Sequence, residues 1–151
     1  MKKYTASHQR KQFVMFDEHR NEVGRIVDAS KIFSLRHYII YNARSYDIRN
    51  VGFMKNDVEL FNARGVIYFT DLAKERIIKS GEKVRIYNFA LRKTNQLYEK
   101  GRLLIEIREE KKWFKDPVFH IEADESTHDL LVLTFLYYST KEFNGIGGDG
   151  D

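Results

Sequence analysis

The stretch that decides the fold lies near the C-terminus, where residues 126–138 read STHDLLVLTFLYY. Ser126 or Thr127 is placed to cap a helix, and Asp129 follows in the first turn, where the helix dipole favours an acid. Every face of the helix predicted over residues 130–138 is apolar. A helix that is apolar all round has to be buried on all sides.

The length of this run limits how it can be buried. A bilayer span needs about 20 apolar residues, so we expect no transmembrane span. A buried strand stays open as an alternative, because short apolar runs do not separate helix from strand. In a chain rich in strand patterns, a closed antiparallel barrel encloses a helix most simply, and a sandwich capped by the helix is the competing architecture. Burying about six large side chains, at about 1.5–3 kcal/mol each, would make this helix the main stabilising element.

Strand patterns fill most of the chain before the helix. Two hairpins are predicted. One pairs residues 13–16 with 23–27 around a polar turn, and the other pairs 58–61 with 66–69 around a loop that ends in Gly65. The whole chain predicts about nine to twelve strands.

Other strand signals are less regular. Residues 32–41 predict one long strand, and the charged residues 109–112 predict a turn. Tyr46 and Tyr68 are expected to point into the barrel, because aromatic side chains at alternating strand positions favour the core.

One short helix is predicted near residues 71–80, with Asp71 as its N-cap and Gly81 as its stop. We therefore predict a mainly β fold: a closed antiparallel barrel of about 9–12 strands around a central hydrophobic C-terminal helix. Residues 1–143 form a single domain in this prediction, and residues 144–151 form a flexible Gly/Asp-rich tail.

Composition restricts the class of protein. The chain is 42% hydrophobic and 32% charged, which excludes an intrinsically disordered protein. It contains no Cys, so disulfides are excluded and a reducing compartment is expected. The first eleven residues have no apolar core, so no signal peptide is expected. These features predict a cytoplasmic protein, with peripheral membrane attachment as the only membrane association.

Charge is distributed unevenly. Residues 1–115 carry 25 bases and 14 acids, whereas residues 116–151 carry one base and eight acids. A basic body attracts polyanions, including acidic lipid headgroups. The bases are scattered rather than gathered in a dense run, so there is no strong nucleic-acid signal, and a solvated surface is the alternative interpretation.

The most basic aromatic stretch is Lys111-Lys112-Trp113-Phe114-Lys115. It predicts contact with an anionic membrane surface through Lys111, Lys112 and Lys115, with Trp113 as an interfacial anchor. The favoured alternative places Trp113 and Phe114 in the core, with the lysine stems extending along the surface.

Chemistry-bearing residues cluster between the last strand and the helix. His120, Glu122 and His128 are candidate metal ligands, with Asp124 and Glu125 between them. Their spacing matches no established ligand pattern, and the alternative is an exposed strand edge followed by a helix cap. No HExxH, GxSxG or P-loop motif is present, so no cofactor is expected.

The chain resembles the Tubby C-terminal-like fold of tubby domains, phospholipid scramblases and LURP-one-related proteins. The resemblance rests on the opening strand–turn–strand unit over residues 13–26, on the strands that end in Trp113-Phe114 and residues 118–121, and on the apolar helix over 130–138. It covers about residues 4–143. It implies a twelve-stranded barrel threaded by the helix, and membrane-related binding without catalysis.

The predicted function is therefore a non-enzymatic binding or scaffold module, with anionic lipid headgroups as the leading ligand. A small metal-dependent enzyme that uses the His120–His128 region is one alternative. A protein–protein interaction module is the other.

Overall fold

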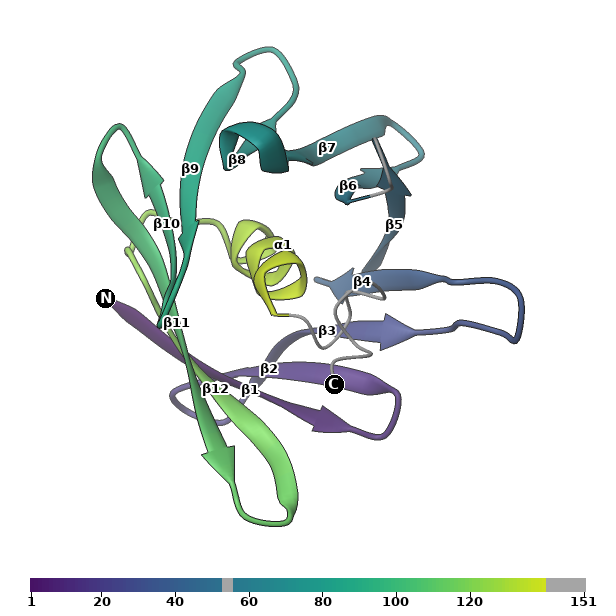
Figure 1. Cartoon of the computed structure of the whole chain (residues 1–151), viewed down its shortest axis with the longest axis vertical. Helices are drawn as coiled ribbons and strands as arrows, with labels where there is room; N and C mark the ends of the chain where they lie inside the picture. Colours follow the sequence, from purple (N-terminus) through teal and green to yellow (C-terminus); the bar gives the residue numbers. More distant parts are fainter. Residues whose placement is uncertain (53–55, 141–151) are drawn as a thin grey trace.

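A computed structural model describes residues 1–52 and 56–140 of the chain, so the tail predicted for residues 144–151 lies outside the described residues. Figure 1 shows one α-helix in the middle of a ring of strands. The elements are β1 (Lys2–Gln9), β2 (Gln12–Asp17), β3 (Glu22–Asp28), β4 (His37–Tyr41), β5 (Arg44–Val51), β6 (Asp57–Asn62), β7 (Gly65–Asp71), the 3-10 turn η2 (Leu72–Lys74), β8 (Arg76–Lys79), β9 (Arg85–Leu91), β10 (Asn95–Glu99), β11 (Arg102–Lys112), β12 (Lys115–Ala123) and α1 (Asp129–Ser139).

Backbone pairing closes the sheet on itself. Each strand pairs antiparallel with its neighbours in the chain, and β1 also pairs with β12, from Lys2 opposite Ala123 to Ser7 opposite Val118. Closure leaves no unpaired sheet edge. The closed antiparallel barrel is confirmed, with twelve strands, the upper limit of the prediction, and the sandwich is excluded.

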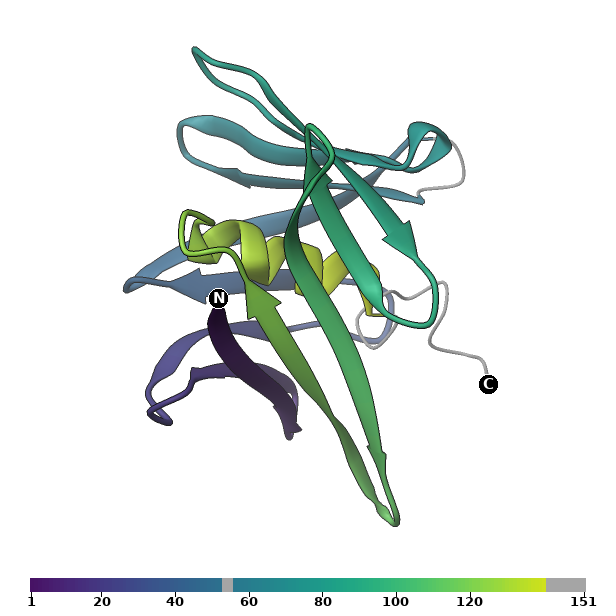
Figure 2. The same cartoon turned by 90° about the vertical axis from the view of Figure 1, so that its left-hand side faces the viewer.

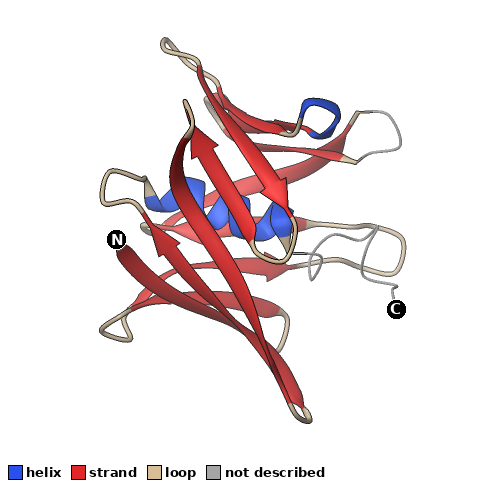
Figure 3. Cartoon of the chain, turned by 60° about the vertical axis from the view of Figure 1, so that its left-hand side comes forward, coloured by secondary structure: helices blue, strands red, loops and turns tan. Residues whose placement is uncertain are grey.

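Side chains alternate between the inside and the outside of the barrel, as the pleat of a strand requires. Tyr4 on β1 and Phe119 on β12 face inward and are buried. Tyr46 and Tyr68 are also buried in the core, as predicted. Both predicted hairpins are present as β2–β3 and β6–β7, and Figure 3 shows how little of the described chain lies outside strands and helix.

The helix α1 fills the barrel and is buried from its second residue to its last. This confirms the central helix and excludes the alternative of a buried strand. The predicted caps Ser126 and Thr127 are wrong: the N-cap is His128, whose Nδ1 accepts the Leu130 N–H at 3.1 Å. The Asp124 carboxylate instead binds the Ser126 N–H in a turn, which delays the start of the helix.

A glycine allows β3 to approach the helix closely. A Cβ atom on Gly24 would lie 2.6 Å from Leu133 Cδ1 and 2.9 Å from the carbonyl oxygen of Ile40. Carbon atoms in contact sit about 3.5–4.0 Å apart. Only glycine therefore fits between the helix and β4 at this point.

The helix predicted near residues 71–80 is wrong beyond its first turn. Asp71 does cap η2, as predicted, but Glu75 adopts a left-handed φ of 51° and ends the turn. The chain then enters β8, which pairs with both β7 and β9 and buries Ile77 completely. A β-branched side chain favours a strand, and closure requires a strand at this place.

The strand predicted over residues 32–41 is also too long, because β4 covers only its last five residues. Residues 29–36 form a loop instead. The Asp28 carboxylate accepts the Ser30 N–H at 2.9 Å, and Ser30 Oγ accepts the Arg36 N–H at 3.0 Å. These local side-chain bonds compete with strand pairing.

Antiparallel order places successive connections alternately at the two ends of the barrel. We call the end where α1 finishes the basic end and the end where α1 begins the neutral end; in Figure 2 they lie at the right and the left. Among the fully described connections, the basic end carries 10–11, 29–36, 72–75, 92–94 and 113–114, and the neutral end carries 18–21, 42–43, 63–64, 80–84, 100–101 and 124–128.

Candidate functional site

Charge distinguishes the two ends. The described connections of the basic end contain seven bases and one acid, a net charge of +6, whereas those of the neutral end contain four bases and four acids. The charged residues of the basic end are Arg10, Lys11, Lys31, Arg36, Lys74, Arg92, Lys93 and Glu75. These bases are scattered along the sequence, and the antiparallel order brings them together. The basic end therefore attracts anionic surfaces.

The β11–β12 hairpin extends beyond the barrel at this end. No residue from Arg108 to Val118 is buried, and Figure 2 shows the hairpin projecting away from the helix. The turn predicted at residues 109–112 is wrong, because pairing continues to Lys112 opposite Lys115. The turn consists of the two residues between them, and we call residues 111–115 the hairpin tip.

Two aromatic side chains form the turn of the hairpin tip. Trp113 is 85% exposed and Phe114 is 96% exposed, with their ring centroids 5.5 Å apart. The favoured prediction that they pack in the core is wrong, because the hairpin has already left the core where they occur. Phe114 also has a φ of 59°, a left-handed conformation that costs a bulky residue about 1–2 kcal/mol.

Three exposed lysines flank these two aromatic residues in sequence: Lys111, Lys112 and Lys115. Lys112 and Lys115 are direct cross-strand partners. Like charges directly opposite each other on a sheet are destabilising. The Glu110 carboxylate moderates this charge, since its Oε2 lies 3.7 Å from Lys112 Nζ. An anion bound between Lys112 and Lys115 would offset their repulsion.

The structure gives each predicted metal ligand a different place. His120 Nε2 lies 2.6 Å from Glu110 Oε1 on β11, and this hydrogen bond lowers the pKa of Glu110. Glu122 is exposed on β12, and His128 caps α1 with its ring against Tyr41. Within residues 1–52 and 56–140, no group of three or more His, Asp or Glu side chains could hold a metal ion.

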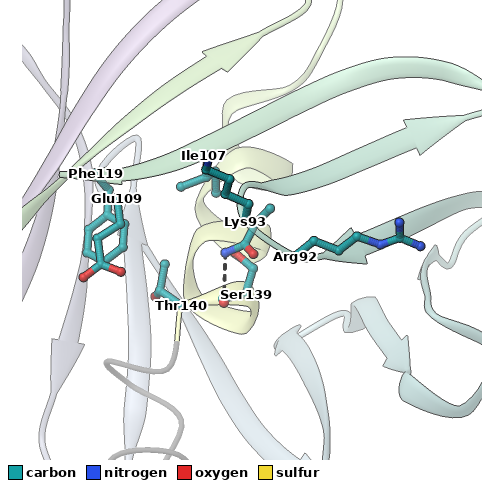
Figure 4. Close-up of a pocket in the computed structure, with 8 residues that line it drawn as sticks. Arg92, Lys93, Ile107, Glu109, Phe119, Ser139 and Thr140 are labelled. Atoms are coloured by element: carbon teal, nitrogen blue, oxygen red, sulfur yellow. Dashed lines mark hydrogen bonds between the residues drawn. The ribbon is translucent and has the colours of Figure 1, made fainter. Parts of the chain in front are cut away.

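A pocket of about 250 Å³ opens beside the last turn of α1 at the basic end (Figure 4). Arg92 and Lys93 line it, and Asn95 Nδ2 donates a hydrogen bond to the Ser139 carbonyl oxygen at 3.1 Å. The Glu109 carboxylate lines it too, and the C-terminal end of a helix dipole is negative. The carboxylate and the helix dipole both disfavour an anion inside the pocket.

Comparisons of the chain with protein-family models, with curated proteins and with solved structures found no match. Among the described residues, no helix has the length and apolar character that crossing a bilayer requires. The class of protein that the fold defines is a closed twelve-stranded antiparallel barrel with a buried helix.

Proposed function

We propose that this protein is a non-catalytic module that binds anionic membrane surfaces through the hairpin tip. The observation that carries the proposal is the exposure of Trp113 and Phe114 between Lys112 and Lys115. Tryptophan is enriched where a membrane meets water. Each basic side chain near an acidic membrane surface contributes about 1 kcal/mol of binding. The tip thus combines an interfacial anchor with ligands for lipid phosphates.

Two energetically unfavourable arrangements at the hairpin tip support a functional role. Phe114 occupies a backbone conformation that favours glycine, and Lys112 faces Lys115. Neither arrangement stabilises the barrel. Unfavourable local arrangements of this kind cluster at functional sites. Binding to an anionic surface would remove the repulsion between the lysines and bury the rings.

The proposal extends to fold kinship with the Tubby C-terminal-like proteins. Its support is the combination of twelve antiparallel strands in a closed barrel with one buried C-terminal helix. The resemblance implies membrane-related binding, the same class of function that the hairpin tip supports on its own chemistry. A peripheral membrane location is part of this proposal.

Vesicle flotation tests the proposed function. The full chain is mixed with vesicles of phosphatidylcholine alone and with vesicles that also contain phosphatidylserine, at low and physiological salt. We expect binding to the acidic vesicles only, and weaker binding at the higher salt, where charges are screened over about 8 Å. Trp113 is the only tryptophan in the chain, so a blue shift of its emission should accompany binding.

A variant of the tip tests its basic component. The triple variant K111S/K112S/K115S should bind acidic vesicles roughly 100-fold more weakly, since it loses three basic contacts. The double variant K83S/K100S is the matched control, because it removes two exposed lysines from the neutral end of the barrel. Equal binding to neutral and acidic vesicles, or no binding to either, would overturn the proposal and favour a protein partner.

A further inference from the structure

A second exposed apolar group lies in the loop over residues 29–36. Ile32 is 90% exposed, Phe33 is 100% exposed and Leu35 is 55% exposed. Phenylalanine and isoleucine are normally among the most buried residue types. Lys31 and Arg36 flank the group in sequence. The loop therefore repeats the chemistry of the hairpin tip: apolar side chains in water between two bases.

The loop holds these side chains outward through its own hydrogen bonds. The Lys31 N–H donates to the Ser34 carbonyl oxygen at 2.7 Å, and the Ser34 N–H donates to the Lys31 carbonyl oxygen at 3.0 Å. These reciprocal bonds close a tight turn with Ile32 and Phe33 at its end. The Ala29 N–H also binds the Arg36 carbonyl oxygen at 2.9 Å and closes the base of the loop. The exposure of Phe33 is thus set by a bonded turn.

Sheet order places this loop on the same side of the basic end as the hairpin tip. The hairpins β11–β12, β1–β2 and β3–β4 are consecutive around the barrel, and Figure 1 shows them fanning out in that order. The turn between the two apolar groups is Arg10-Lys11. The Asp28 N–H donates to the Lys11 carbonyl oxygen at 2.9 Å, which joins this turn to the end of β3.

We infer that the loop over residues 29–36 is a second point of insertion into an anionic bilayer. The protein docks on two apolar groups, Phe33 with Ile32 and Trp113 with Phe114, while Arg10 and Lys11 contact headgroups between them. This inference rests on the proposed function and adds a fixed orientation, with the basic end against the membrane. Two weak contacts held by one rigid barrel bind far more tightly than either does alone.

Charge complementarity identifies the occupant as a lipid surface. The fully described connections of the basic end carry a net charge of +6, against zero for those of the neutral end. The acids beside the loop already have partners: Asp47 pairs with Arg36 at 3.7 Å, and the Asp28 carboxylate accepts the Ser30 N–H at 2.9 Å. An acidic bilayer carries phosphates over its whole surface. It can therefore contact the three adjacent hairpins β11–β12, β1–β2 and β3–β4 at the same time.

Moving the single tryptophan tests the second contact directly. In F33W/W113F the only tryptophan lies in the loop, and in V84W/W113F it lies at the neutral end. With vesicles of phosphatidylcholine and phosphatidylserine, we expect a blue shift and quenching by brominated lipid for the tryptophan at position 33. The tryptophan at position 84 should show neither effect. The variant I32S/F33S, with Trp113 intact, should bind these vesicles more weakly by at least about tenfold.

The outcomes separate this inference from the proposed function. A shift of Trp113 emission in the unaltered protein, with no shift in F33W/W113F and full binding by I32S/F33S, would overturn the second contact and leave the hairpin tip as the sole anchor. No shift in any of these proteins would overturn both. A shift for V84W/W113F equal to that for F33W/W113F would show that the basic end has no preferred orientation towards the bilayer, which also overturns the inference.

Discussion

The helix α1 and the turn of the hairpin tip both carry large apolar side chains, lie close in sequence, and have opposite surroundings. Every residue of α1 after Asp129 is buried, whereas Trp113 and Phe114 keep nearly all of their surface exposed. The strand β12 joins the two regions. The difference teaches that position relative to the barrel interior, and not side-chain type, decides whether an apolar residue stabilises the fold or is available for binding.

Polar contacts at the neutral end hold the start of α1 in place. At the neutral end Lys2 Nζ donates to the Thr127 carbonyl oxygen at 2.6 Å, and the Tyr4 hydroxyl donates to the Asp129 carboxylate. Burial and the neighbouring Asp129 carboxylate raise the pKa of Tyr4, so this donor stays protonated. Asp129 also lies at the helix N-terminus, where an acid is favoured. These contacts fix the start of α1 to β1 and leave the basic end to its exposed loops.

The largest expected effect is on the helix side of the comparison. Phe135 is fully buried and is among the largest side chains of the core. Phe135→Ala should lower the free energy of unfolding by about 3–5 kcal/mol, because it loses transfer free energy and leaves a cavity. Urea unfolding followed by circular dichroism measures the change. A loss below about 1 kcal/mol would show that the barrel does not depend on packing against its helix.

The sequence predicts the interior of this protein well, for a physical reason. A nine-residue run with no polar face, from Leu130 to Tyr138, can be stable only when it is enclosed, and alternating patterns upstream supply the enclosing strands. The segment needs to be buried because its own residues leave no polar face for water. The cap was misplaced because Ser126, Thr127 and His128 can all accept a backbone N–H, and only the turn made by Asp124 selects His128.

The basic end was harder to predict because exposure is not a local property. Trp113 and Phe114 have core-like side chains, and their exposure depends on β11 extending past the barrel. The loop over residues 29–36 was missed because Ile32 resembles the start of a strand. One signal was present: Asp28 and Ser30 are residue types that bind nearby backbone and interrupt strands. The gathering of distant bases required the antiparallel order, which no segment specifies alone.

A pH effect of intermediate size should come from the interior near α1. Burial lowers the pKa of His37 against the opposing influence of Asp28, and His37 Nδ1 lies 2.8 Å from the Tyr137 hydroxyl. Below pH about 6.5 the unfolded chain binds a proton at His37 that the folded protein resists. The stability contributed by neutral His37 is therefore complete above that pH and is lost as the pH falls below it.

Unfolding midpoints at pH 7.5 and 5.5 measure this effect, with His37→Asn as the comparison. The variant keeps a polar side chain but cannot titrate, so its stability should fall less between the two pH values than that of the unaltered protein. Identical pH dependence in both would mean that His37 accepts a proton in the folded barrel. Variants of the hairpin tip should keep the full pH dependence, because Trp113 and Phe114 are exposed whereas His37 is buried in the interior.

The smallest expected change in stability belongs to the tip, and it should have the opposite sign to the effect of Phe135→Ala. Phe114→Gly removes an almost fully exposed ring and relieves a left-handed φ of 59°. The relief is about 1–2 kcal/mol, and the added freedom of glycine in the unfolded chain costs about 0.5–1 kcal/mol. The free energy of unfolding should therefore stay unchanged or rise by up to about 1.5 kcal/mol, while binding to acidic vesicles weakens.

Lys100→Gly is the matched control, because Lys100 has a φ of 51° in a turn at the neutral end. It should change stability by a similar amount in urea unfolding and leave vesicle binding intact. Should Phe114→Gly instead destabilise the protein by more than about 1 kcal/mol, the ring would be a structural element and the contrast between helix and tip would fail. A stable variant with impaired binding would mean that the chain retains a strained aromatic residue at the tip for its contact with the membrane.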